Sequence, residues 1–306
     1  MIYTVTLNPS VDLFVYMENL MYGRNNRIKT EKTVPGGKAL NVSRILSQLR
    51  IPTVATGYAG GFQGEFIKDW LQKDGIMTDF VQIKNENRTN IKMIMGDTET
   101  TINSRGPQIS ENEVNELIYY LSRVGEGDTV IMGGSVPPLK EKDIYARMIS
   151  VCKANKANFV IDIPAEYLLN AVKQGPLLVK PNDDDLEIMF DKKMSTTKDL
   201  VKYGLKIIDL GAKNSIVSLG ENGSLFFTED KKVYRAYSIK GDVKNTIACR
   251  DAMIGGFVGT YMRTGDPLES YRVSVAAASA TAMVEDLPTA ESINDLIPKV
   301  NIEKLQ

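Results

Sequence analysis

The sequence predicts an α/β fold in three layers (α/β/α), with helices on both faces of a mainly parallel sheet and a small second β-sheet beside it. Along most of the 306 residues, β-branched segments of strand length alternate with segments whose apolar residues recur at helical spacing. Helical crossovers of this kind join parallel strands. Extended pieces at 11–16, 28–34 and 88–103 do not fit the alternation, so we expect them to form the second sheet.

We expect a single domain over residues 1–306. No low-complexity linker, block of like charge or internal repeat divides the chain. The second sheet is then a discontinuous β-lid, contributed by about 11–34 and 88–103. A sheet that stands apart from the core suggests a cover over a binding site.

Local patterns define the elements of the first half in order. β-branched residues at 2–7 predict a strand, which Asn8 and Pro9 end. A Pro-Gly-Gly turn at 35–37 precedes apolar residues at helical spacing, which predict a helix over 40–49. Further strands are expected at 52–56, 88–95, 99–103, 129–132 and 159–163, and further helices at 64–74, 111–124 and 140–153.

The second half repeats the alternation. Its expected elements are a strand at 177–180, helices at 183–190 and 197–211, a strand at 215–219, a hairpin of 224–228 with 232–237, and helices at 251–262 and 267–283. The last helix carries the small-residue run 276–280, which suits it to close packing. These two closing helices complete the expected core.

Composition excludes several classes of function. The chain has no histidine, which removes Ser-His and Cys-His nucleophile pairs, His-ligated zinc and imidazole bases. Its 37 basic and 38 acidic residues give a net charge of −1, so no overall basic field attracts nucleic acid or an acidic membrane. Acid and base chemistry therefore falls to Asp, Glu, Lys, Tyr or Cys.

Cysteine content and the first residues bear on location. Only Cys152 and Cys249 occur, too few for a disulfide framework in a chain of this size. The apolar start at 1–7 lacks a basic leader and stops at Asn8-Pro9, so neither a signal peptide nor an anchor is expected. We expect a reducing, cytoplasmic location.

Two glycine-containing turns are candidate anion sites. The segment 35–41 runs directly into a helix, where backbone N–H groups, the helix dipole and the Lys38 ammonium would meet an anion. The alternative is a turn that merely starts a helix. The segment 218–223 follows a strand and is either a hairpin turn or a phosphate or ribose contact; by itself it favours the turn.

Acidic residues stand at two expected helix starts. Asp183, Asp184 and Asp185 follow an apolar strand, where α/β sheets place ligands, and carboxylates suit Mg²⁺ bound through water. The alternative, which spacing by itself favours, is an acidic N-terminal turn on a helix. Asp251 opens another helix and is either a cap or, in a chain without histidine, a group that accepts a proton from a substrate hydroxyl.

Taken in order, these segments resemble the ribokinase or phosphofructokinase-B sugar kinases over nearly the whole chain. The resemblance is carried by the segments at 6–12 (TLNPSVD), 35–44 (PGGKALNVSR), 180–182 (KPN) and 217–220 (VSLG), and it is nearest to the bacterial 1-phosphofructokinase and tagatose-6-phosphate kinase branch. It implies a ribokinase-like α/β/α fold with a β-lid, often dimerised through that lid. It also implies transfer of the ATP γ-phosphoryl group to a sugar hydroxyl with Mg²⁺.

The resemblance also implies roles for individual residues. The substrate-binding positions are Asp12, Gly37, Lys38 and Asn41, with Arg88 and Arg27 on the phosphate that the sugar already carries. The nucleotide-binding positions are Lys180, Asn182, Ser218, Gly220, Gly223, Ala248 and Cys249. Asp185 corresponds to the Glu that organises Mg²⁺ through water, and Asp251 corresponds to the catalytic base.

The chain departs from the family at the anion hole. Where the family usually has Gly-Ala-Gly-Asp, residues 248–251 read Ala-Cys-Arg-Asp, which keeps the base and replaces both glycines. Ala248 is tolerated if its φ is negative, whereas Arg250 at a position that needs positive φ would be strained by about 1–3 kcal/mol. The Arg250 side chain has three alternatives: it binds the transferring phosphoryl group, it pairs with Asp251 and lowers the pKa of that carboxyl, or it is solvated without effect.

The function expected from this sequence is an ATP-dependent kinase of a hexose phosphate, most simply fructose 1-phosphate. Asp251 is expected to be catalytic, with Arg250 beside it. The alternatives are a kinase of tagatose 6-phosphate or another sugar phosphate, and a non-catalytic sensor of nucleotide or sugar phosphate, which the altered anion hole suggests. The expected partners are sugar phosphate, ATP, Mg²⁺ and a second copy of the chain, without nucleic acid or membrane.

Overall fold

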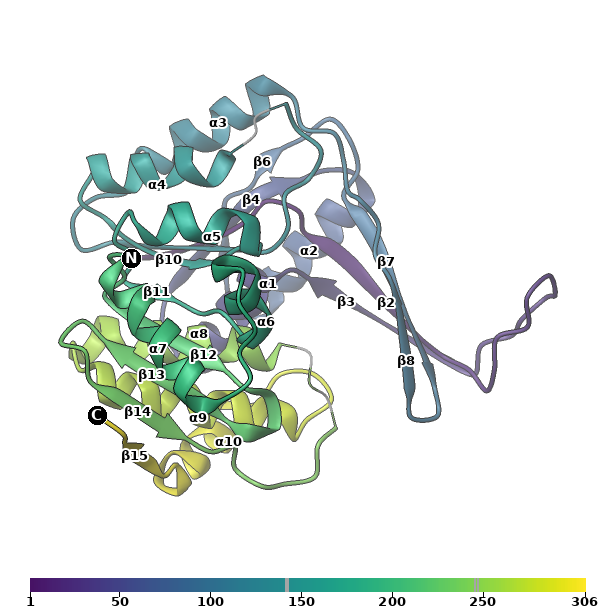
Figure 1. Ribbon diagram of the computed structural model, residues 1–306. Helices are drawn as coiled ribbons and strands as arrows, with labels where there is room; N and C mark the ends of the chain where they lie inside the picture. Colours follow the sequence, from purple (N-terminus) through teal and green to yellow (C-terminus); the bar gives the residue numbers. More distant parts are fainter. Residues whose placement is uncertain (141–142, 245, 247) are drawn as a thin grey trace.

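A mixed sheet of eleven strands forms the centre of the computed structural model, which describes residues 1–140, 143–244, 246 and 248–306 (Figure 1). In spatial order the strands are β15 (Ile302–Lys304), β14 (Val233–Ala236), β13 (Ser224–Thr228), β12 (Asn214–Ser218), β11 (Leu178–Val179), β10 (Asn158–Asp162), β9 (Thr129–Gly133), β1 (Ile2–Thr6), β4 (Thr53–Ala59) and β5 (Met77–Thr78), with β6 (Val81–Gln82) also on β4. Pairing is parallel from β12 to β5 and antiparallel from β12 to β15.

Helices cover both faces of this sheet. One face carries α3 (Glu111–Leu121), α4 (Ile144–Ala154), α5 (Ala165–Val172), α6 (Asp183–Phe190) and α7 (Thr197–Asp209). The other carries α1 (Lys38–Gln48), α8 (Cys249–Thr264), α9 (Pro267–Ala282) and α10 (Ala290–Leu296), while α2 (Gly61–Lys73) packs on β4 and β5. Short 3₁₀ turns, η1 (Gly220–Asn222) and η2 (Ile297–Lys299), complete the described elements.

Alternation along each strand produces the two cores. Val130 and Met132 of β9 lie in the core beneath α3–α7, whereas Ile131 between them lies in the core beneath α1, α8 and α9. Successive side chains of a strand point to opposite faces, so a strand covered on both sides is apolar throughout. On β13, Phe226 stacks on Tyr271 of α9 with ring centroids 4.7 Å apart.

A separate four-stranded sheet projects from the body (Figure 1). Its spatial order is β3 (Thr30–Gly36), β2 (Ser10–Tyr16), β7 (Arg88–Met95) and β8 (Thr98–Ile102). β2 pairs antiparallel with β3 and parallel with β7. The segment that joins β2 to β3 extends farthest from the core.

The expected fold class is confirmed, including the small sheet, but several elements were missed. α5, α10, β5, β6 and β15 are short, and a strand of two or three residues carries too little periodicity to be recognised. The helix expected over 140–153 is present as α4 from Ile144, and residues 141–142 of that range lie outside the described residues.

Candidate active site

Charged and polar side chains gather where three neighbouring parallel strands end. Asp162 is the last residue of β10, Lys180 directly follows β11, and Ser218 ends β12. The carboxyl ends of parallel strands meet at one edge of a sheet, which is where α/β proteins bind ligands. The N-termini of α1, α6 and α8 bring further candidate residues from the segments at 38–41, 182–185 and 248–251.

Asp251 is a buried carboxylate in the first turn of α8, with 6% of its surface exposed. Its Oδ2 accepts a hydrogen bond of 2.8 Å from Nδ2 of Asn41 on α1. Burial, with a contribution from the negative charge of Asp162, raises its pKa from 3.8 to about 6. A carboxylate with this pKa is ionised at neutral pH and basic enough to take a proton from a positioned hydroxyl. The residue therefore has the properties of a general base.

Two lysines approach the buried carboxylate of Asp162. Nζ of Lys38 lies 3.3 Å from its Oδ1, and Nζ of Lys180 lies 4.0 Å from the same atom, too far for a hydrogen bond. Burial would raise the pKa of Asp162, but the charges of Lys180, Lys38 and Arg250 hold it below the ordinary value. Asp162 was not among the residues selected from sequence; its position at the end of a buried strand is the signal that would have indicated it.

Lys180 is a fully buried ammonium without a hydrogen-bond partner among the described residues. Burial lowers its pKa from 10.5 to about 8, and the positive charges of Arg250 and Lys38 contribute in the same direction. A buried cation without hydrogen bonds is unfavourable, so the side chain is suited to an anion that enters from outside.

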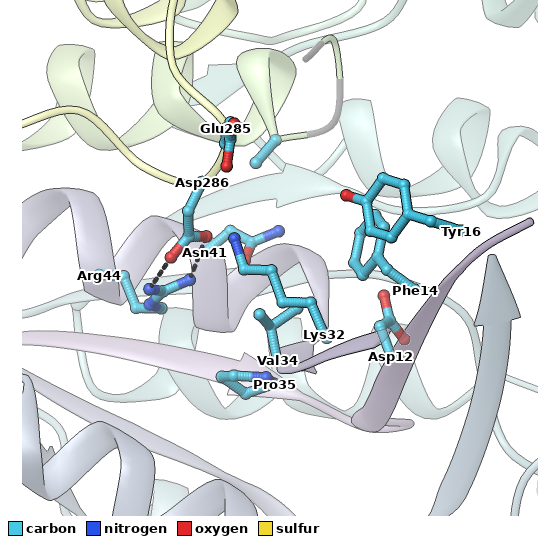
Figure 2. Close-up of a pocket in the computed structure, with 12 residues that line it drawn as sticks. Asp12, Phe14, Tyr16, Lys32, Val34, Pro35, Asn41, Arg44, Glu285 and Asp286 are labelled. Atoms are coloured by element: carbon cyan, nitrogen blue, oxygen red, sulfur yellow. Dashed lines mark hydrogen bonds and ion pairs between the residues drawn. The ribbon is translucent and has the colours of Figure 1, made fainter. Parts of the chain in front are cut away.

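Asp12 is held in place by its neighbours on the small sheet. Its Oδ1 accepts hydrogen bonds from Oγ of Ser10 at 2.7 Å and from Nδ2 of Asn90 at 2.8 Å. Figure 2 shows Asp12, Phe14 and Tyr16 along β2, across a cavity from Asn41 and Arg44 of α1. Ser10 and Asn90 are supporting residues that the sequence analysis did not identify.

The figure also shows what fixes α1 at this cavity. Arg44 makes a bidentate ion pair with Asp286, at 3.1 and 2.7 Å. Its Nε also donates to Asp74 at 2.9 Å. These bonds tie α1 to the C-cap residue of α2 and to the segment that follows α9. The orientation of Asn41, one turn earlier on α1, is thereby fixed.

The glycines at the start of α1 are required by geometry. Gly37 is the N-cap residue with φ +145°, a region that strains residues with a Cβ. A Cβ on Gly36 would lie 2.5 Å from the carboxyl of Asp12 and from Oγ of Ser10. At Gly36 the backbone therefore lies closer to Asp12 than a residue with a Cβ would allow.

The substrate-binding role that the resemblance implies for Asp12 predicts that Gly36→Ala lowers kcat/KM for the sugar by about 10²-fold. The new methyl group displaces Asp12, and a shift of about 1 Å in a positioning group has an effect of that size. Steady-state kinetics with each substrate varied in turn measures it. Gly125→Ala, where a Cβ meets nothing within 4 Å, is the control. Equal kinetics for the two variants would contradict this role.

The start of α6 forms a capping box. Asn182 accepts from N of Asp185 at 2.7 Å, and Oδ2 of Asp185 accepts from N of Asn182 at 3.0 Å. The structural alternative for these acids, a capped helix start, is therefore present. Oδ2 of Asp185 also binds Nη2 of Arg250 at 3.0 Å.

The contact of Arg250 with Asp185 corrects one of the three alternatives for this arginine. Its partner is Asp185 rather than Asp251, and the pKa of Asp251 is raised instead of lowered. The side chain is 41% exposed, so a contact with the transferring phosphoryl group and a solvated side chain without catalytic effect both stay open.

Neither condition considered for the start of α8 is met. Ala248 has φ +65° and carries the left-handed conformation, whereas Arg250 lies within the helix with ordinary φ. Alanine has no side-chain acceptor, so Ala248 as the N-cap residue does not cap the first turn of α8. Burial raises the pKa of the Cys249 thiol to about 11, which makes it a poor nucleophile.

The segment after β12 is a turn built on two glycines. N of Leu219 donates to the carbonyl of Gly223 at 2.8 Å, and N of Gly223 donates to the carbonyl of Gly220 at 3.1 Å. A Cβ on Gly223 would lie 2.0 Å from the carbonyl oxygen of Ala236. Ser218 forms a β-bridge with Asn182, which places this turn beside the start of α6.

The structure separates the two arginines expected on the sugar phosphate. Arg88 donates from Nε to the carbonyl of Asn8 at 3.1 Å and from Nη1 to the carbonyl of Ser104 at 2.9 Å, which leaves Nη2 for a ligand. Arg27 is exposed in the segment between β2 and β3, which projects away from the body. Within one chain, Arg27 is not brought to the other site residues.

Comparisons with known proteins agree with this geometry. The model of the family described as pfkB family carbohydrate kinase matches residues 5–292. The chain is 38% identical over 305 residues to the 1-phosphofructokinase of Bacillus subtilis and 33% identical over 306 residues to the D-tagatose-1-phosphate kinase of Bacillus licheniformis, with 100% of both chains covered in each case.

A solved structure shares the fold. Phosphofructokinase-2 from Escherichia coli, in complex with substrates and products, has a TM-score of 0.92 to this chain, with 97% of this chain and 98% of that chain covered at 24% identity. Among the described residues, no helix is both long and apolar enough to cross a bilayer. With the family match over most of its length, the chain belongs to the pfkB family of carbohydrate kinases and is a phosphotransferase that acts on an alcohol group of a sugar phosphate.

Proposed function

We propose that this kinase transfers the γ-phosphoryl group of ATP to fructose 1-phosphate, with Asp251 as the base that accepts the proton of the attacking hydroxyl. The observation that carries the proposal is the buried carboxylate of Asp251, held by Asn41 and surrounded by cationic side chains. Lys38, Lys180 and Arg250 supply positive charge for the phosphates, together with the positive end of the α8 dipole. Positioning and electrostatic stabilisation carry most of the catalysis in phosphoryl transfer.

The donor set suits Mg²⁺ held largely through water and phosphate. Among the described residues, no group of three or more His, Cys, Asp or Glu is arranged to hold a metal. Asp185 is a half-buried carboxylate at the site, and Oδ2 of Asp162 is buried without a hydrogen-bond partner in the described part of the chain. One or two carboxylates with several waters is the usual coordination of Mg²⁺ in kinases. When bound, the ion would neutralise phosphate charge, with Asp185 as its expected protein contact through water.

Support for the sugar comes from the names of the relatives. Two curated relatives, at 38% and 35% identity, are named 1-phosphofructokinase, and two others, at 33% and 26% identity, are named D-tagatose-1-phosphate kinase. Each of these names places a phosphate at position 1 of a ketohexose. Tagatose 1-phosphate is therefore the second candidate, in preference to the 6-phosphate considered from the sequence.

A substrate panel tests the proposal. ADP release with Mg²⁺ and ATP is measured for fructose 1-phosphate, tagatose 1-phosphate, fructose 6-phosphate, tagatose 6-phosphate and the free sugars. The expected result is the highest kcat/KM for fructose 1-phosphate. A higher value for tagatose 1-phosphate favours the second candidate. Nucleotide binding without turnover of any sugar would overturn the assignment and favour the sensor.

The pH profile of kcat/KM is expected to be bell-shaped. Activity rises with pH through about 6 as Asp251 loses its proton, and falls above about 8 as Lys180 loses its positive charge. Rates between pH 5 and 9.5 measure both limbs.

Two variants identify the groups responsible. Asn41→Ala removes a hydrogen bond that lowers the pKa of Asp251, so the acid limb of the profile moves to higher pH. If the acid limb came from ionisation of the substrate phosphate instead, the substitution would not move it. Lys180→Arg keeps its charge and moves the alkaline limb upward. A limb that does not move in its variant would show that the corresponding residue is not the group that titrates there.

We also propose that the four-stranded sheet acts as a lid and that two copies of the chain pair through it. Asp12, Phe14 and Tyr16 face α1 across the cavity in Figure 2, as a lid over the sugar would require. A molar mass in solution twice that of the chain would support the dimer. A proposed cytoplasmic location fits Cys152 and Cys249, which do not form a disulfide.

A further inference from the structure

An ion pair joins the starts of two helices at the nucleotide side of the site. Nη2 of Arg250, in the first turn of α8, lies 3.0 Å from Oδ2 of Asp185, in the first turn of α6. The two side chains are 41% and 25% exposed, so the pair is open to solvent and to a ligand. It is a single contact rather than a bidentate one, and Nε of Arg250 is buried without a hydrogen-bond partner among the described residues.

The surroundings of this pair are rich in positive charge. The guanidinium acts electrostatically on both Lys180 and Asp162, and it lowers the pKa of the lysine. Both helix N-termini direct the positive ends of their dipoles to the same region. Like charges that are held together without full pairing favour the entry of an anion.

Asp185 is held by its own helix independently of the arginine. Its capping box with Asn182 uses the same Oδ2 that accepts from Arg250, together with its backbone N–H. The carboxylate therefore keeps its place when the guanidinium leaves. Arg250 is the movable member, because it is a long side chain held by a single contact.

We propose that Arg250 exchanges Asp185 for the terminal phosphate of the nucleotide, so that the pair seen here is the resting state of a phosphate-binding residue. The inference rests on the proposed kinase function. A guanidinium prefers phosphate, to which it donates two parallel hydrogen bonds, over a single carboxylate contact. The exchange leaves Asp185 available to the cation that accompanies the phosphates.

The exchange predicts opposite effects for the two members of one ion pair. Arg250→Gln removes the donor to phosphate and is expected to weaken the binding of ATP about tenfold or more. Asp185→Asn removes the competitor and is expected to strengthen it about twofold to fivefold, the strength of a solvent-exposed ion pair. Asn retains the oxygen that caps α6, so the helix start is preserved.

The measurement is calorimetric titration of each protein with ATP in the presence of EDTA, which excludes the role of Asp185 toward a metal. Asp184→Asn is the matched control, because it removes the same charge from the exposed neighbouring position and is expected to change the affinity less than twofold. Arg250→Lys is expected to fall between the wild type and Arg250→Gln. Thermal unfolding confirms that each variant is folded.

The exchange is supported if Arg250→Gln weakens and Asp185→Asn strengthens the binding of ATP, while Asp184→Asn leaves the affinity unchanged within twofold. Shifts in the same direction, no shift, equal effects of Asp184→Asn and Asp185→Asn, or no detectable ATP binding by any of the proteins overturns it. Failure of the proposed function is separate: it is seen when the wild type phosphorylates no sugar phosphate in the panel, whatever the affinities are.

Discussion

Asp251→Asn is expected to reduce sugar-dependent ADP formation by about 10²–10⁴-fold, the usual contribution of a positioned general base. The amide has nearly the same shape, and its oxygen still accepts the hydrogen bond from Asn41, so the site keeps its geometry. Nucleotide binding is expected to be nearly unchanged, because Asp251 faces the sugar hydroxyl in the proposed reaction. Steady-state kinetics and ATP titration measure the two effects.

The same substitution is expected to stabilise the fold. Burial raises the pKa of Asp251 from 3.8 to about 6, so the folded state binds more protons than the unfolded state between these values. Stability therefore falls as pH rises through this window, by about 3 kcal/mol in all, and the loss persists at neutral pH. The asparagine variant avoids this loss and should unfold at higher urea concentration at pH 7.5.

The combination of lost activity and gained stability distinguishes a base from a structural carboxylate. Asp295→Asn, which changes an exposed residue of α10 far from the site, is the control and should alter neither quantity. An active variant, or one that loses stability together with activity, would remove Asp251 from the proposed role.

Asp162→Asn is expected to destabilise the fold by about 3 kcal/mol, the lower end of what breaking a buried ion pair costs. Lys180 is buried completely, and it forms an ion pair with the carboxylate of Asp162, 4.0 Å away. Neutralising the acid leaves the ammonium without compensation. Urea unfolding at pH 7 measures the loss.

Two further observations identify the cause. The double variant with Lys180→Met, which has no buried charge at this pair, should recover a large part of the stability. The difference between the wild type and Asp162→Asn should also shrink above about pH 8, where Lys180 loses its proton in the wild type. A double variant no more stable than the single one would show that the pair is not coupled.

Much of the fold follows from local patterns in the sequence. Periodicity of 2 or 3.6 residues is a property of neighbours along the chain, and it predicted the alternating strands and helices, the extended pieces of the small sheet and the closing helices at 251–262 and 267–283. Elements of two or three residues, such as β11 and β15, contain too little of this signal for their limits to be predicted.

The candidate site was only partly predictable. Motifs selected Asp251, Lys38, Asn41 and Lys180, which the structure brings together with the buried Asp162. Asp162 has no motif around it in the sequence. It becomes notable only because its strand ends beside the lysines.

By itself the sequence determined the α/β class and the residue types available for chemistry, since both depend on composition and on local spacing. Tertiary structure decided the partners: Arg250 binds Asp185, Asp251 binds Asn41, Ala248 takes the left-handed conformation, and Arg27 is exposed away from the site. The physical reason is that these contacts depend on where the ends of strands and helices converge. Convergence is set by packing across the whole sheet, and a local pattern does not contain it.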